Sequence, residues 1–421
     1  MIRGLREELL GRGIVLSYLT VMLVTTTEGT MNLLFPLYLD QRGYVLAGIG
    51  TIASLFAVMQ LVSRVPVGAA YHASTARRQL AAWLVVFALS TTGYAIVGGS
   101  LPLIIALTLV HGFAFGALGT LNLAQAIDIT GGRKAGPVMG WYTASLSLGY
   151  ALGAFAGGAL ADRVGVGGAL AILGLAPLLG LAAVMASPPI VGVARPPRGT
   201  GPILGRALGA WRSIDGRVWL AFAIVLFLNT VSDSVDTFFP LFGTVALGLP
   251  VAALGALKGV KSAAATVVRF LSGAVFRVVD FRVVNFWGVV VMSVTTIALA
   301  HVAAYPALVV LFIVLGTCRG MLRVTSAATI AGLRSEGKDV GLASGVYNAG
   351  LDLGAIIGPA AGGVLATAFG LGTMFQLVAG ASLVVYLAVA LASPSGRKGL
   401  RVLPSRAPAA ATPPETPMTS R

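Results

Sequence analysis

The chain has 421 residues, of which 57% are hydrophobic and only 10% are charged, and its formal net charge is +15. Soluble proteins carry about 25% charged residues, so this composition excludes an ordinary soluble domain and indicates a polytopic membrane protein. The basic residues fall in alternate loops between apolar runs, which argues against nucleic acid as a partner. The one cysteine, Cys318, excludes an internal disulfide and a cysteine-based metal site.

Twelve apolar runs are long enough to cross a bilayer of about 30 Å as helices. Placing the N-terminus inside puts most of the 29 basic residues at the two termini and in the inner loops. The positive-inside rule therefore predicts a multi-pass protein of the cell (inner) membrane with both termini in the cytoplasm. The first run is too long for a signal-peptide core, so we expect no cleaved signal. The predicted spans are 14–39, 45–70, 80–98, 101–126, 136–160, 168–186, 218–242, 250–276, 283–303, 306–331, 341–366 and 372–392.

Composition divides the chain into two predicted six-helix bundles and three polar segments. The central segment is rich in proline, glycine and arginine, and the C-terminal one is rich in proline, alanine and threonine, which predicts disorder there. The predicted segments are a cytoplasmic N-terminus (1–13), an N-terminal bundle (14–186), a cytoplasmic linker (187–217), a C-terminal bundle (218–392) and a disordered cytoplasmic tail (393–421).

The two predicted bundles repeat each other. Residues 136–165 and 341–370 are identical at 14 of 30 positions when aligned at an offset of 205. Residues 35–37 and 239–241 both read Phe-Pro-Leu, at an offset of 204. These matches predict an internal duplication of two halves in parallel.

Glycines recur at every fourth residue in the span 341–366 and, in part, in its repeat mate 136–160. That spacing places them on one helix face, where small residues let another helix approach closely. We expect these rows to form a seam between the halves, and Gly358→Leu to abolish activity while leaving membrane insertion intact. The candidate packing or gating residues are Gly149, Gly153, Gly157, Gly354, Gly358, Pro359 and Gly362.

Twelve predicted helices in two parallel halves, with a basic central linker, resemble the major facilitator superfamily over about residues 14–392. A glycine pattern in the eleventh span is similar to the antiporter signature that this superfamily usually shows in its fifth helix. The chain departs from the superfamily's loop signature between helices 2 and 3, because His72 and Ala73 stand where an acidic and basic pair is expected. The antiporter-like pattern is Gly345, Gly354, Gly358-Pro359 and Gly362-Gly363.

The resemblance implies an all-α membrane protein with twelve transmembrane helices in two parallel six-helix pseudo-repeats. It also implies a secondary transporter whose halves rock around a midplane site lined mainly by helices 1, 4, 7 and 10.

Nine ionisable side chains fall deep inside the predicted helices. Each costs at least about 2.5–3.5 kcal/mol in hydrocarbon, so each is a functional candidate by default. Apart from the histidine, four acids and four bases could neutralise one another. The nine are Glu28, His111, Asp233, Asp236, Lys258, Lys261, Arg319, Arg323 and Asp352.

Glu28 lies about 21 Å along the first predicted helix, beside three threonines. A carboxyl group removed from water favours its neutral form, which would let Glu28 take up and release a proton. The alternative is a carboxylate that bonds the threonines or faces the outer vestibule. His111 is either packed and hydrogen-bonded or, where wetted, a group that exchanges protons near physiological pH.

Asp233 and Asp236 share one helix face, and Lys258 and Lys261 repeat their spacing on the next predicted helix. We expect salt bridges between these helices. One interpretation is a structural network. The other is a functional group of charges, which is either a gate that breaks during transport or an anion or proton site.

Arg319 and Arg323 either grip a carboxylate or phosphate of the substrate with their forked donors or pair with Asp352 on the next helix. Arg64 and Arg269 lie near helix ends, where we expect them to reach toward the membrane surface.

These residues divide into two groups of candidates, and we expect no catalytic residues, metal or cofactor. The proton-coupling candidates are Glu28, Asp233, Asp236, Asp352 and His111. The substrate-binding candidates are Arg319, Arg323, Lys258, Lys261 and Glu28.

The leading hypothesis is proton-coupled efflux of a small amphipathic or organic-anion solute by rocker-switch alternating access. The alternative is a proton symporter or uniporter that imports a sugar, nucleoside or carboxylate. A third is a membrane accessory protein that transports nothing. An enzyme is not expected, since no nucleophile and base set is visible. The expected partners are a small-molecule substrate, protons and the lipid bilayer, for a monomeric protein that binds no nucleic acid.

Overall fold

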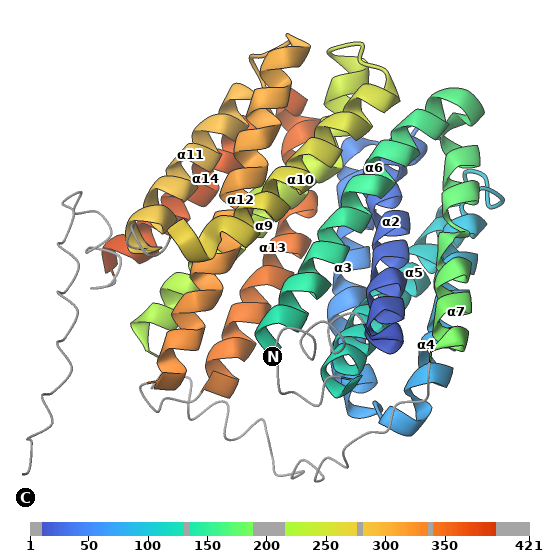
Figure 1. Ribbon diagram of the computed structural model, residues 1–421. Helices are drawn as coiled ribbons and strands as arrows, with labels where there is room; N and C mark the ends of the chain where they lie inside the picture. The colour runs from blue at the N-terminus through green and yellow to red at the C-terminus, as the bar shows by residue number, and fades with distance from the viewer. Residues whose placement is uncertain (1–10, 130–134, 188–214, 276–280, 336–339, 393–421) are drawn as a thin grey trace, which may run out of the picture.

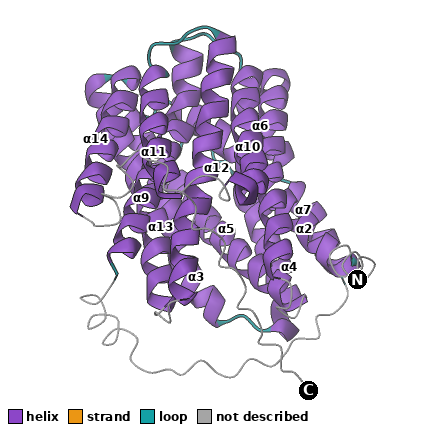
Figure 2. Ribbon diagram, turned by 60° about the vertical axis from the view of Figure 1, so that its left-hand side comes forward, coloured by secondary structure: helices purple, strands orange, loops and turns teal. Residues whose placement is uncertain are grey.

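The computed structural model describes residues 11–129, 135–187, 215–275, 281–335 and 340–392. Most of the predicted N-terminal segment and linker, and all of the predicted tail, lie outside these ranges. Within them the chain forms twelve helices and no strand (Figure 2), which confirms the all-α fold class.

The twelve helices fall into two halves of six, in chain order. The N-terminal half consists of α2 (Arg12–Asp40), α3 (Leu46–Ala69), α4 (Ala73–Gly93), α5 (Leu101–Ile129), α6 (Ala135–Leu173) and α7 (Ala176–Ala186). The C-terminal half consists of α9 (Gly216–Val245), α10 (Val251–Val275), α11 (Phe281–Ala298), α12 (Tyr305–Ser335), α13 (Val340–Phe369) and α14 (Leu371–Ala392).

Nine helical stretches of the described chain are long and apolar enough to span a membrane, with α6 and the short α7 counted as one stretch. The α6 helix is interrupted at Gly165, whose φ of 76° breaks the helical backbone and lies in the loop that the sequence predicts between two spans. The α4 helix begins and ends earlier than predicted. Just after its end, the Tyr38 hydroxyl donates to the carbonyls of Tyr94 (2.5 Å) and Gly98 (3.0 Å).

The two halves lie side by side, with the blue and green helices on one side of Figure 1 and the yellow and red helices on the other. Their joint consists of α6 packed on α10 and of α3 packed on α13, with α2 packed on α9 between them. At the offset of about 205 residues, α3 corresponds to α10 and α6 corresponds to α13. The joint therefore repeats one packing arrangement twice.

The rows of glycines pack within each half, so the expectation that they form the seam is wrong. A Cβ added at Gly153 would overlap the Thr26 carbonyl on α2, and one added at Gly358 would lie 2.5 Å from the Thr230 carbonyl on α9. Each contact carries a hydrogen bond at the repeated position. Thr30 donates to the carbonyl of Gly153 (2.9 Å), and Ser234 donates to that of Gly358 (2.8 Å).

The joint between the halves uses the neighbouring glycines. Gly363 faces Gly50 across α13 and α3, and Gly158 faces Gly255 across α6 and α10, with a Cβ at each meeting backbone of the other half. We call these four glycines the seam glycines. Pro359, alone among the seven predicted packing residues, also lies here, because its carbonyl stands against Gly50.

Side chains of one half cap helices of the other beside the seam glycines. The Asp162 carboxylate accepts the backbone N–H groups of Val251 (3.1 Å) and Ala252 (2.9 Å) at the start of α10. At the repeated position, Thr367 accepts the N–H of Ala47 (2.9 Å) near the start of α3. These caps lie at the end of the bundle opposite the first turn of α2 and the last turn of α14. We call that end distal and the other end terminal.

Because the glycine rows hold each half together, Gly153→Ala and Gly358→Ala should each destabilise the protein by about 1–3 kcal/mol through overpacking. The measurement is the thermal unfolding of purified protein in detergent. Gly345→Ala is the matched control, since a Cβ there meets nothing within 4 Å. Equal melting temperatures for Gly345→Ala and Gly358→Ala would contradict the packing role.

Candidate functional site

A cluster of charged side chains on α9, α10 and α12 is centred on Asp236. One carboxylate oxygen of Asp236 accepts from Lys261 at 2.5 Å, and the other accepts from Arg319 at 2.9 Å. Lys258 lies 3.9 Å from the same carboxylate. Both lysines are buried. The predicted salt bridges between the aspartates and the lysines are therefore present, and they meet at one aspartate.

Asp233 contacts only the arginine of this cluster, because its carboxylate lies 3.8 Å from Arg319 and makes no ion pair within 4 Å with either lysine. The side chains of Asp233 and Arg319 keep 24% and 29% of their surface exposed, so solvent reaches this edge of the cluster. Three cations here face two carboxylates, which leaves one positive charge in excess. Arg323, one turn away on α12, has no carboxylate within 4 Å among the described residues.

Lys258 connects the two halves at mid-span. Its ammonium donates to the carbonyl oxygen of Asn32 on α2 at 2.6 Å and to that of Asp236 on α9 at 2.8 Å. The sequence offers Lys258 as a partner for carboxylates, but its closest acceptors are backbone carbonyls.

Glu28 and His111 form a buried pair in the N-terminal half. The Glu28 carboxylate lies 3.1 Å from Nε2 of His111, and the two residues are 3% and 1% exposed. Nδ1 of His111 lies 3.3 Å from the hydroxyl of Thr91. The α2 and α5 helices thus place an acid and a base in contact within the apolar bundle.

The surroundings of this pair are aromatic. The rings of Phe56, Phe87 and Tyr94 lie 4.7–6.1 Å from the His111 ring. The neighbouring threonines do not bond Glu28, since Thr25 and Thr26 donate to carbonyls one turn earlier in α2. The sequence presented Glu28 and His111 as separate candidates, and only the packing of α2 on α5 reveals the pair.

Tyr150 on α6 is a site residue that the sequence did not single out. It lies within electrostatic range of Glu28 in its own half and of Asp233, Asp236 and Arg319 in the other. Its backbone packs against Gly29, beside Glu28. The sequence does contain a signal for Tyr150, because the residue at the repeated position in the other half is Ala355.

Asp352 pairs with Arg64 at 2.9 Å, so its predicted pairing with Arg319 or Arg323 is wrong. The contact joins α13 to α3 across the halves, and Arg64 reaches the other half rather than the membrane surface. At the repeated position Arg269 on α10 donates to the hydroxyl of Ser147 on α6 at 2.9 Å. One arginine contact on each side of the joint therefore lies toward the terminal end, and only one of the two is an ion pair.

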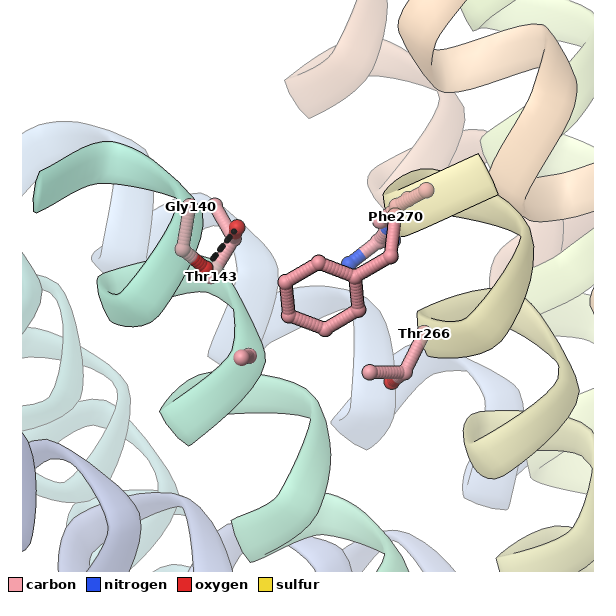
Figure 3. A pocket seen from close by; sticks show the side chains of 6 residues that line it. Gly140, Thr143, Thr266 and Phe270 are labelled. Atoms are coloured by element: carbon pink, nitrogen blue, oxygen red, sulfur yellow. Dashed lines mark hydrogen bonds between the residues drawn. The ribbon is translucent and has the colours of Figure 1, made fainter. Parts of the chain in front are cut away.

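A pocket opens beside Arg269 on the terminal side of the joint between α6 and α10. Phe270 points from α10 toward Gly140 and Thr143 of α6 (Figure 3). Ala144 and Thr266 complete its lining with Arg269. The pocket is thus a gap between the halves whose walls are apolar and hydroxyl side chains with one arginine.

No group of three or more His, Cys, Asp or Glu residues in the described ranges is arranged to hold a metal ion.

A twofold-repeated helical membrane protein with ionisable side chains at the joint between its halves has the architecture of a secondary transporter. The model of the Major Facilitator Superfamily matches residues 17–313 and 278–417. The chain belongs to the Major Facilitator Superfamily, as its resemblance implied.

Solved structures of low sequence identity share the fold. A point mutant of the nucleoside transporter NupG has a TM-score of 0.72 at 14% identity, over 89% of this chain and 98% of that one. A bacterial homologue of the human lysosomal transporter Spinster, inward-facing and unoccupied, has a TM-score of 0.70 at 12% identity, over 92% and 96%. Unmutated NupG gives 0.68 at 15% identity. Among curated protein sequences, none matches this chain.

Asp236→Asn should destabilise the protein by about 3–5 kcal/mol, because it leaves Lys261 and Arg319 without their shared counter-charge. Asp233→Asn is the control and should cost much less, since Asp233 makes one longer contact and is more exposed. Thermal unfolding in detergent measures both. A loss from Asp233→Asn as large as that from Asp236→Asn would contradict the central place of Asp236.

Ser147→Asp should create a second ion pair, with Arg269, and so raise the melting temperature and slow transport in proteoliposomes. Asp352→Ser makes the reverse exchange and should lower the melting temperature. Changes of the same sign in the two variants would contradict the equivalence of these contacts.

Proposed function

We propose that this protein is a proton-coupled secondary transporter that exports a small amphipathic solute carrying a negative group. The observation that carries the proposal is the excess of positive charge at the partly exposed edge of the Asp236 cluster. Arg319 is held there by two aspartates, and Arg323 stands one turn away with no carboxylate partner within 4 Å in the described chain. An arginine fork binds a carboxylate or phosphate through paired hydrogen bonds.

In this proposal the substrate anion competes with Asp233 and Asp236 for binding to Arg319. The contact of Arg319 with Asp233 is long, at 3.8 Å. Its contact with Asp236 is one of several that the Asp236 carboxylate makes. A bound anion could therefore take one face of the guanidinium while Lys261 continues to hold Asp236. Arg323 would supply the second cation.

The proton would be carried by the Glu28–His111 pair. A carboxylate and an imidazole 3.1 Å apart can share one proton, and burial makes the net charge of the pair costly to change without a compensating movement. Tyr150, within electrostatic range of Glu28 and of the Asp236 cluster, would link the proton site to the anion site.

Export is favoured by the antiporter-like glycine pattern of α13. In this proposal both termini lie in the cytoplasm, and the protein is a monomer in the inner membrane. The alternative is proton-coupled or uncoupled import of a metabolite such as a nucleoside, sugar or carboxylate. The observation that favours it is the likeness to the nucleoside transporter NupG over 98% of that chain.

Glu28→Gln should abolish proton-driven uptake into proteoliposomes but leave exchange of labelled for unlabelled substrate, because exchange needs no net proton movement. Arg319→Ala should lose both activities, since it removes the anion's partner. A screen of organic anions, nucleosides and sugars by thermal stabilisation supplies the substrate. Proton-driven transport that survives Glu28→Gln would refute the coupling role, and unchanged substrate affinity in Arg319→Ala would refute the anion site.

A further inference from the structure

Two prolines free two backbone carbonyls at repeated positions. Proline has no backbone N–H, so the carbonyl four residues before it lacks its helical partner. Pro36 in α2 leaves the carbonyl of Asn32, and Pro240 in α9 leaves that of Asp236. The two prolines are repeat mates at an offset of 204, and so are the two carbonyls.

Both freed carbonyls converge on one ammonium group. Lys258 donates to the Asn32 oxygen at 2.6 Å and to the Asp236 oxygen at 2.8 Å. These take two of its three N–H donors, and the Asp236 carboxylate lies 3.9 Å away. Lys258 is 6% exposed. Its repeat mate in α3 is Ala53, so a single lysine serves both halves.

We propose that the carbonyl oxygens of Asn32 and Asp236, with the Asp236 carboxylate, form a binding site for a small primary ammonium or a monovalent cation. The chain's own Lys258 ammonium fills this site. Two carbonyl oxygens and a carboxylate are ligands that a small cation accepts. The oxygens belong to opposite halves, so the cation ties α2 to α9 at mid-span.

The site shares the Asp236 carboxylate with Arg319, but its two carbonyl oxygens belong to neither the proposed anion site nor the proposed proton site. It requires the carbonyls of two helices, whereas the proposed transport function rests on the side chains of Arg319, Arg323, Glu28 and His111. A melting experiment without any transport substrate therefore tests it independently of the proposed function.

The test is chemical rescue of Lys258→Ala. Alanine keeps Cβ, so n-propylammonium replaces the atoms that are lost. We expect the purified variant to melt below the wild type and to rise in melting temperature with n-propylammonium concentration. Tetramethylammonium chloride at equal ionic strength, which has the charge but no N–H donor, should give no such rise. A NaCl series would show whether a bare monovalent cation also binds.

Lys261→Ala is the matched control. Lys261 contacts the Asp236 carboxylate at 2.5 Å and no freed carbonyl, so n-propylammonium should not restore its stability. Equal rescue of Lys258→Ala and Lys261→Ala, or equal effects of n-propylammonium and tetramethylammonium on Lys258→Ala, would overturn the proposal. So would the absence of any response to n-propylammonium.

Proline replacement tests the site even where Lys258→Ala does not yield folded protein. Pro36→Ala with Pro240→Ala restores both helical N–H groups. Combined with Lys258→Ala, these changes should recover monodisperse protein on size exclusion and remove the response to n-propylammonium. Pro359, in α13, does not free a carbonyl that Lys258 contacts. Adding Pro359→Ala to Lys258→Ala should therefore not recover folded protein. A triple variant no more stable than Lys258→Ala, or rescue by Pro359→Ala, would overturn the proposal.

Discussion

The carboxylate of Asp236 is the group on which the buried charges of α9, α10 and α12 depend. It accepts from Lys261 and Arg319 with separate oxygens and lies within ion-pair range of Lys258. Without it, two buried lysines and an arginine would repel one another in a poorly solvated interior, where an uncompensated charge costs several kcal/mol. Because α9, α10 and α12 each supply part of this arrangement, the charges also fix how those helices pack. Arg319 is thereby held at the one edge of the cluster that solvent reaches.

The duplication has produced symmetric packing and asymmetric chemistry. The seam glycines, the helix caps between the halves and the Thr30 and Ser234 hydrogen bonds all recur at the same offset. Apart from Arg64 and Arg269, the ionisable groups discussed above do not recur, since Asp236 corresponds to Asn32, Lys258 to Ala53 and Asp352 to Ser147. Packing must be preserved in both copies for the two halves to fold alike, whereas a charged group at one repeated position need not be present at the other.

The sequence was sufficient for the fold, because twelve apolar runs and a repeat at one offset leave few other architectures. It also placed every candidate charge within a helix, since hydrocarbon makes such residues conspicuous. It could not give their partners. The pairing of Glu28 with His111 depends on how α2 packs against α5, and that of Asp352 with Arg64 on a contact across 288 residues. The helices against which the glycine rows pack could not be predicted for the same reason. Periodicity defines a helix face but not the neighbouring helix that covers it.

The unequal arginine contacts bear on how this protein opens. On one side of the joint Arg64 contacts Asp352 in an ion pair, and on the other Arg269 donates to the neutral hydroxyl of Ser147. The first contact joins two opposite charges, whereas the second joins a charge to a neutral hydroxyl, so these two contacts tie the halves unequally. The pocket that Phe270 lines lies on the side of the neutral contact, between α6 and α10 (Figure 3). Under the proposed function, an opening of the joint on that side would admit an amphipathic molecule sideways from the leaflet.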